Sequence, residues 1–121
     1  MNPAELFRLD SEPVHIAPGE TLFRAGDVGQ EMFVLIEGTA EISIGEVVVE
    51  TASPGALLGE MALIEDAPRT ATITAKTACL LARVNQRRFH FLIQQNPFFA
   101  THVMKVLVER LRHMNQLLTK P

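Results

Sequence analysis

Short apolar runs that alternate with glycine-, proline- and aspartate-rich turns limit the possible folds of this sequence most strongly. Runs such as M-F-V-L-I-E-G and T-A-E-I-S-I follow one another between residues 14 and 84. Turn residues about every 8–12 positions are typical of a β-sandwich or jelly roll. A length of 121 residues suits one domain with a real core. We therefore predict one mainly β domain over residues 1–121, with a β-sandwich or jelly-roll barrel over about residues 12–84.

Helical patterns flank this predicted barrel. Residues 3–10 predict a short first helix. After the barrel, Asn85 is a predicted N-cap for a short helix, and Pro97 starts the longest helix, which extends to about Thr119. The C-terminal helices thus cover about residues 86–119.

The last predicted helix has an apolar stripe with the spacing of a coiled-coil seam. The stripe consists of Met104, Leu107, Leu111, Met114 and Leu118. Val103 and Val108 widen it, so part of it should pack on its own barrel. Two interpretations stay open, because such a stripe forms either internal core or a contact between two copies.

The stretch from Pro54 to Thr74 contains the residues that are most suggestive of a ligand. A glycine, Gly59, lets the backbone approach a ligand closely, and a predicted helical turn begins just after it. Free N–H groups at such a turn favour anions. Arg69 offers a planar fork that suits two phosphate oxygens, and Glu60 can only accept hydrogen bonds. This combination predicts a pocket for a sugar phosphate.

Each of these two charged residues also has a simpler interpretation. An acid at the start of a helix can merely compensate the helix dipole. An arginine that follows a proline in a loop is often a solvated surface charge. The whole pattern favours the ligand: L-G-E-M-A-L, five intervening residues, then R-T-A-T-I-T.

That pattern resembles the phosphate-binding cassette of the cyclic-nucleotide-binding domain family, the fold of catabolite activator protein and of kinase regulatory subunits. A second family pattern is visible in residues 22–38, L-F-R-A-G-D-V-G-Q-E-M-F-V-L-I-E-G. The resemblance extends from about Leu6 to about Leu118. It implies the family's fold, a jelly-roll β-barrel (double-stranded β-helix) of about eight strands with flanking helices. It departs from the family at Leu58, where phenylalanine is common, and in the short turn at residues 44–46.

The resemblance implies roles for individual residues. Glu60 would accept a hydrogen bond from the ribose 2′-hydroxyl, and Arg69 would pair with the cyclic phosphate. Thr70 would contact the phosphate or a purine, although it is equally well explained as a β-branched residue that enters a strand. Backbone N–H groups of Gly59, Met61 or Ala62, and Ala71 would complete the anion cradle, with Val49 against the base. The predicted ligand-binding set is Val49, Leu58, Gly59, Glu60, Met61, Ala62, Arg69, Thr70 and Ala71.

Other classes of function find little support. The four histidines lack metal-ligand spacing, and no nucleophile, base and acid occur in a catalytic arrangement. We therefore predict no metal, no cofactor other than a cAMP or cGMP ligand, and no enzymatic activity. No apolar run is long enough to span a membrane, and the N-terminus has no signal-peptide pattern, which predicts a cytoplasmic protein.

Charge divides the chain in two. Residues 1–68 contain two arginines against thirteen acids, whereas residues 69–121 contain nine lysines and arginines against Glu109 alone. The simplest use of this split is an internal contact between an acidic barrel and basic helices. A direct nucleic-acid contact is not expected, because no recognition motif accompanies the modest basic excess.

The resemblance therefore predicts a free-standing sensor domain that binds a cyclic nucleotide, with cAMP favoured over cGMP as the ligand. Its signal would pass through movement of the C-terminal helices to a homodimer mate or another protein partner. The alternatives are a nucleotide-independent interaction or dimerisation module, and the sensor half of a truncated transcription regulator. Whether the chain is full-length or an excised domain stays open.

Overall fold

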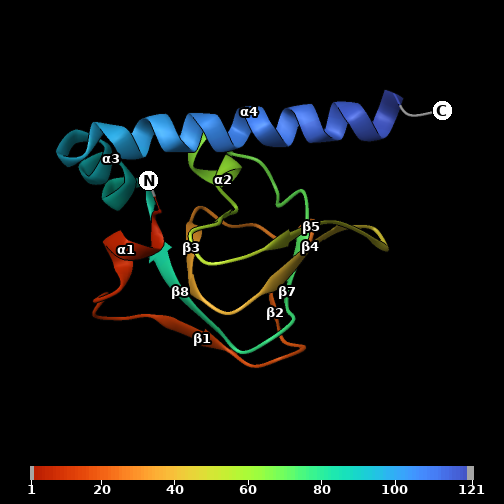
Figure 1. Ribbon diagram of the computed structural model, residues 1–121, viewed down its shortest axis with the longest axis horizontal. Coiled ribbons are helices and arrows are strands. Elements are labelled where there is room, and N and C mark those ends of the chain that lie inside the picture. The colour runs from red at the N-terminus through yellow and green to blue at the C-terminus, as the bar shows by residue number, and fades with distance from the viewer. Residues whose placement is uncertain (1, 120–121) are drawn as a thin grey trace.

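The fold is built from two four-stranded antiparallel sheets and four helices, in a computed structural model that describes residues 2–119 (Figure 1). The strands are β1 (Val14–Ile16), β2 (Thr21–Phe23), β3 (Met32–Glu37), β4 (Ala40–Ile44), β5 (Val47–Ala52), β6 (Leu57–Leu58), β7 (Thr72–Ala75) and β8 (Cys79–Val84). The helices are α1 (Ala4–Phe7), α2 (Met61–Ile64), α3 (Gln86–Gln95) and α4 (Pro97–Thr119).

The strand order is β1-β8-β3-β6 in one sheet and β2-β7-β4-β5 in the other. The predicted jelly roll of eight strands is confirmed. Across the described residues, no strand of one sheet is hydrogen-bonded to a strand of the other. The roll is thus closed by packing of the two sheets rather than by a continuous barrel of hydrogen bonds.

Strand β3 explains why there are two apolar cores rather than one. Successive side chains of a strand point to opposite faces, and both faces of β3 are buried. Phe33 and Leu35 lie in the core between the two sheets, whereas Met32, Val34 and Ile36 lie in a second core beneath the helices. A strand buried on both faces needs an uninterrupted apolar run, which is the run that the sequence has.

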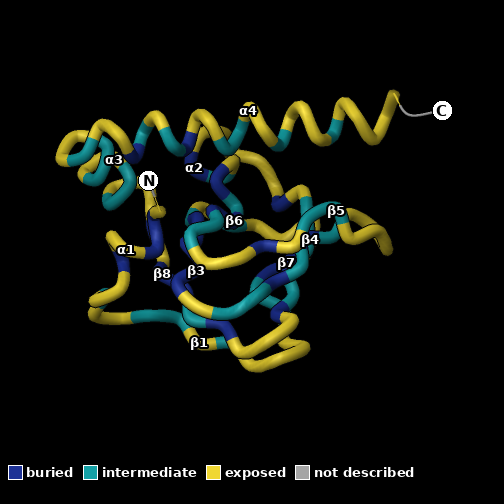
Figure 2. The backbone as a smooth tube through the Cα atoms, in the orientation of Figure 1, coloured by how far each residue is buried: buried dark blue, intermediate teal, exposed yellow. Residues whose placement is uncertain are grey.

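The second core attaches α4 to the sheet. Phe99 and Val103 of α4 are buried against it, and Phe89 of α3 and Phe7 of α1 stack edge-to-face on the Phe99 ring. These contacts fix the N-terminal half of α4, while its C-terminal half continues along the roll past the β4–β5 hairpin (Figures 1 and 2).

Two helix starts were predicted, one at the N-cap Asn85 and one at Pro97, and both are confirmed. The Asn85 side chain accepts a hydrogen bond from the Arg88 backbone N–H at 2.8 Å and so caps α3. Helix α4 covers Pro97–Thr119, as predicted. The first helix is shorter than expected, because it ends at Phe7 rather than near residue 10.

The predicted seam on α4 is only partly correct. Leu107 and Met114 turn inward and are half-buried, so they do not belong to an exposed stripe. Apolar residues occur around most of this helix, and spacing alone did not fix which of them face the roll. The outward face has its own seam, which consists of Met104, Val108, Leu111, Asn115 and Leu118.

Among residues 2–119, no helix combines the length and the apolarity that a membrane crossing requires.

Candidate functional site

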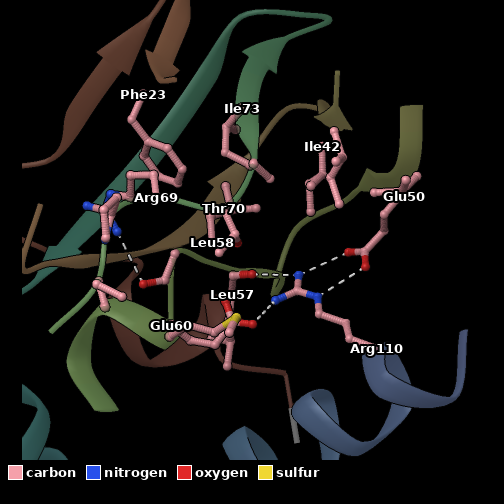
Figure 3. A pocket seen from close by; sticks show the side chains of 18 of the residues that line it. Phe23, Ile42, Glu50, Leu57, Leu58, Glu60, Arg69, Thr70, Ile73 and Arg110 are labelled. Carbon is pink, nitrogen blue, oxygen red and sulfur yellow. Dashed lines mark hydrogen bonds and ion pairs between the residues drawn. The ribbon is translucent and has the colours of Figure 1, made fainter. Parts of the chain in front are cut away.

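A cavity of about 210 Å³ opens between the second sheet, the segment from residue 57 to residue 71, and α4 (Figure 3). All nine residues of the predicted ligand-binding set line it. The cavity is smaller than the roughly 300–1,000 Å³ that is usual for small-molecule sites, because side chains from α4 close one side of it. Its further lining residues include Phe23, Ile42, Glu50, Leu57, Arg110, His113 and Met114.

Arg69 is held in the cavity wall by its own backbone. Its N–H donates to the Asp27 carbonyl at 2.9 Å, and its carbonyl accepts from the Gly26 N–H at 2.8 Å. These two bonds join the cassette to the loop before β3. The preceding Pro68 restricts the chain further, so the direction of the Arg69 side chain is set by local structure.

The Arg69 guanidinium is buried, with the residue 9% exposed, and is incompletely hydrogen-bonded. Its Nη1 donates to the Gly59 carbonyl at 3.3 Å, and its Cζ lies 4.2 Å from the centre of the Phe23 ring (Figure 3). Its Nε is buried without a hydrogen-bond partner. Burial lowers the pKa of Arg69, although the charges of Glu31 and Asp27 oppose this. The interpretation of Arg69 as a solvated surface charge is therefore wrong.

Two glycines make the space that this guanidinium occupies. A Cβ on Gly29 would lie 2.5 Å from Arg69 Nη2, and a Cβ on Gly59 would lie 2.5 Å from Arg69 Nη1. Gly59 also has a positive φ of 76°, which disfavours other residues. The sequence analysis gave no site role to Gly29 or Phe23. Gly29 lies within the second family pattern, and that was the signal for it.

Glu60 is the second buried charge of the cavity, with the residue 5% exposed. It occupies the position before α2, yet its side chain makes no capping hydrogen bond there. Its Oε1 instead accepts from Arg110 Nη1 of α4 at 2.5 Å. Dipole compensation at the start of α2 is thus not the main interaction of this carboxylate.

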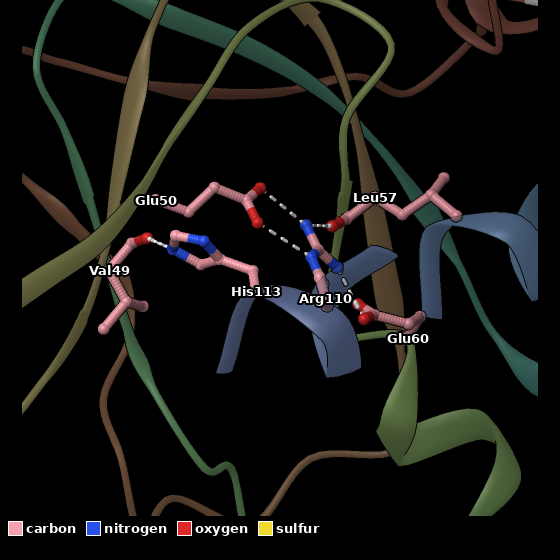
Figure 4. A network of polar contacts seen from close by, with 6 residues as sticks. All are labelled: Val49, Glu50, Leu57, Glu60, Arg110 and His113. Carbon is pink, nitrogen blue, oxygen red and sulfur yellow. Dashed lines mark hydrogen bonds and ion pairs between the residues drawn. The ribbon is translucent and has the colours of Figure 1, made fainter. Parts of the chain in front are cut away.

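Arg110 connects α4 to the cavity through three further hydrogen bonds (Figure 4). Its Nε and Nη2 donate to the two carboxylate oxygens of Glu50 at 3.1 and 3.0 Å, and Nη2 also donates to the Leu57 carbonyl at 2.7 Å. Burial alone would lower the pKa of Arg110, but the hydrogen bonds and charges of Glu50 and Glu60 outweigh it and raise that pKa. We call Arg110, Glu50, Glu60 and the Leu57 carbonyl the Arg110 bridge.

Sequence reasoning missed the Arg110 bridge. A signal was present, because Val103, Leu107, Arg110 and Met114 recur at helical spacing, with a charge in an otherwise apolar stripe. One helical turn beyond Arg110, His113 Nε2 donates to the Val49 carbonyl at 2.9 Å.

The remaining predicted residues differ in what they can offer. The Ala62 N–H donates to the Gly59 carbonyl at 3.2 Å within the α2 turn, so it is already used. Thr70 is exposed at the rim, and Val49 is half-buried in the wall beside Ile42. Within residues 2–119, no group of three or more His, Cys, Asp or Glu side chains is arranged to hold a metal ion. The cavity therefore provides a ligand with one buried cation, Arg69, one buried carboxylate, Glu60, and an apolar wall.

Comparison with known proteins agrees with this chemistry. The family model described as cyclic nucleotide-binding domain matches residues 13–96. A cyclic nucleotide-gated potassium channel of Mesorhizobium japonicum is 34% identical over 95 residues, which are 78% of this chain and 26% of the channel. The cAMP-activated global transcriptional regulator of Pasteurella multocida is 30% identical over 110 residues, which are 85% of this chain and 53% of the regulator.

Comparison of the fold with solved structures leads to the same family. The catabolite activator protein of Thermus thermophilus superimposes with a TM-score of 0.77 at 26% identity, over 88% of this chain and 53% of that protein. This chain spans between about a quarter and about half the length of the curated relatives above. With the family model covering most of the sequence, the chain belongs to the cyclic nucleotide-binding domain family.

Proposed function

We propose that residues 1–121 act as one regulatory domain that binds a cyclic nucleotide, cAMP in preference to cGMP. The observation that supports this most strongly is the buried Arg69 guanidinium, whose Nε has no hydrogen-bond partner. A buried charge without a paired ion is costly. A cyclic phosphate has one negative charge and oxygens that can accept from several guanidinium nitrogens at once.

The other lining residues fit the rest of such a ligand. Glu60 can accept only, and one of its oxygens remains for a ribose hydroxyl when the other pairs with Arg110. Val49, Ile42 and Met114 offer apolar contact to a purine. The amides of Gly59, Met61 and Ala71, together with Thr70, are the proposed remaining contacts of the phosphate. The name of the Pasteurella relative, a cAMP-activated regulator, supports cAMP over cGMP.

Thermal unfolding with millimolar cAMP, cGMP or 5′-AMP tests this proposal. A ligand at a hundred times its Kd stabilises the fold by about 2.7 kcal/mol, which raises Tm by several degrees. We expect a rise with cAMP, a smaller one with cGMP and none with 5′-AMP. An Arg69→Gln variant should lose the rise, and Arg24→Gln, which removes an exposed arginine of the same charge, should keep it. No rise with either cyclic nucleotide would support the nucleotide-independent interaction module instead.

We further propose that the domain signals in the cytoplasm through protein contacts rather than by catalysis or direct nucleic-acid binding. The outward seam of α4 supports a homodimer. Its positions follow a 4-3-4-3 spacing, with Val108 and Asn115 at one heptad position and Leu111 and Leu118 at the other. In a coiled coil, β-branched residues at the a position with leucine at the d position favour a parallel pair of helices, and a single asparagine at a fixes their register. Val108 and Asn115 would occupy a, and Leu111 and Leu118 would occupy d.

Sedimentation equilibrium with and without cAMP tests the homodimer. We expect a dimer that Leu111→Ser converts to monomer, whereas Gln116→Ser, an exposed position off the seam, leaves it intact. A monomer at all concentrations would direct attention to a different protein partner.

A further inference from the structure

Hydrogen bonds between α4 and the sheets come from two side chains, as far as the structure describes the chain. Arg110 provides the Arg110 bridge and His113 contacts the Val49 carbonyl. Both residues lie beyond the apolar anchor formed by Phe99 and Val103. The C-terminal half of α4 is therefore held to the roll largely through polar contacts at one end of the cavity.

Within the bridge, Glu50 and Glu60 contact Arg110 differently. Glu50 receives two parallel hydrogen bonds, at 3.1 and 3.0 Å, which use Nε and Nη2. Glu60 receives one, from Nη1. A bidentate pair fixes the plane of a guanidinium, whereas a single bond does not. Glu50 therefore sets the orientation of Arg110, and the Nη1 that remains is directed at Glu60 (Figure 4).

We propose that Glu50 is a positioning residue that links the sugar end of the cavity to the docking of α4. It holds Arg110 so that one Glu60 oxygen is occupied and the carboxylate is oriented with its other oxygen available to a ligand hydroxyl. This inference rests on the proposed cyclic-nucleotide function, because the hydroxyl that Glu60 reads is the ribose 2′-hydroxyl.

Burial and position support this role. Glu60 has a side chain only 6% exposed, so its charge needs a well-oriented counter-ion more than the 32% exposed Glu50 does. Glu50 lies on β5 and Arg110 on α4, so a change in the contacts of either residue alters the packing between these two elements. A ligand hydroxyl that donates to Glu60 would change the hydrogen bonds that Glu60 accepts, and would therefore change the stability of the α4 contact by the same coupling free energy.

The test compares Glu50→Gln with Glu46→Gln. Glu46 is exposed in the turn of the same β4–β5 hairpin, so the control removes the same charge from the same element. Arg110→Lys keeps the positive charge but lacks the fork, so it separates orientation from charge. All variants are studied as the full chain.

The first readout is amide hydrogen exchange of residues 106–118 without nucleotide. We expect Glu50→Gln and Arg110→Lys to increase exchange by about tenfold, and Glu46→Gln to leave it unchanged. Equal exchange in Glu50→Gln and wild type overturns the proposal. This readout needs no ligand, so it decides the role of Glu50 in holding α4 even if the chain binds no cyclic nucleotide and the proposed function fails.

The second readout is the ratio of Kd values for 2′-deoxy-cAMP and cAMP, measured by calorimetry. Wild type should favour cAMP, and Glu50→Gln should reduce that ratio by about tenfold while the Kd for 2′-deoxy-cAMP stays unchanged. An equal loss of affinity for both ligands would mean that Glu50 only supports the fold, and it overturns the proposal. The same ratio in wild type and Glu50→Gln overturns it as well.

Discussion

Arg69 and Arg110 extend into the same cavity from opposite sides, and they differ in how the protein satisfies them. Arg110 makes four hydrogen bonds, three of them to the carboxylates of Glu50 and Glu60. The Arg69 guanidinium makes one hydrogen bond within the described residues, to the Gly59 carbonyl, and its Nε has no partner. Within residues 2–119 the chain thus forms direct ion pairs with the Arg110 guanidinium, whereas the Arg69 guanidinium has only the more distant charges of Glu31 and Asp27 and forms no direct pair.

The difference separates a structural charge from a ligand-binding one. Removing a satisfied buried arginine leaves unpaired carboxylates behind, which destabilises the fold. Removing an arginine that lacks partners also removes the cost of burying its unpaired nitrogen, so the stability of the fold changes little while ligand binding is lost. The same substitution should therefore mainly lower the stability of the fold at Arg110 and mainly lower ligand affinity at Arg69.

The largest effect on stability is expected for Arg110→Gln. It leaves Glu60 buried without a cation, and we expect the free energy of unfolding to fall by about 2–3 kcal/mol, less than for a fully buried pair because Arg110 is partly exposed. Urea unfolding of this variant and of Arg112→Gln measures it. Arg112 is an exposed arginine two residues along α4, and its substitution should cost less than about 0.5 kcal/mol.

The next effect concerns the space around Arg69. A Cβ on Gly29 would displace the guanidinium, while the backbone of Gly29 needs no positive φ. We expect Gly29→Ala to weaken cAMP binding by about tenfold, or roughly 1.4 kcal/mol. Calorimetry with the adjacent, exposed Val28→Ala as control decides this. Unchanged affinity would mean that Arg69 can move without consequence for the ligand.

Arg69→Gln should have a small effect on the fold itself. Without nucleotide, its free energy of unfolding should lie within about 1 kcal/mol of wild type, because only one hydrogen bond and the contact with the Phe23 ring are lost. The measurement is urea unfolding beside Arg110→Gln. Equal destabilisation by the two substitutions would remove the contrast between the arginines.

The smallest effect is a pH dependence at His102, on the first half of α4. Burial is the largest cause that lowers the pKa of His102 below its ordinary value. The unfolded chain then binds the proton more readily, so stability falls as the pH drops below about 6.5. His102→Gln should flatten the decrease between pH 7 and 5.5 by less than about 1 kcal/mol. His90→Gln, which removes an exposed histidine of α3, serves as the control.

Local patterns predicted most of the fold. The apolar run of β3, the cap at Asn85 and the proline that starts α4 each act within a few residues, so the sequence alone was sufficient to find them. The cassette residues also lie within one short segment, and all of them line the cavity.

Contacts between distant segments explain what could not be predicted. Arg110 is 60 residues from Glu50 and 50 from Glu60, and no local rule pairs them. The rotation of α4 about its axis posed the same difficulty. With apolar residues on most sides, only packing against the second core decides that Leu107 faces inward and Val108 outward.

The burial of both faces of β3 also has a consequence for the order in which the protein is made. Strand β3 pairs with β8, and its helix-facing side is covered by Phe99 and Val103 of α4. A ribosome that adds about 5–20 residues per second completes Val84 roughly one to four seconds before it reaches Val103. During that interval Met32, Val34 and Ile36 lack the cover that Phe99 and Val103 provide in the folded chain. A chaperone that recognises extended apolar segments would find its binding site there, and slower translation of residues 85–103 would prolong its access.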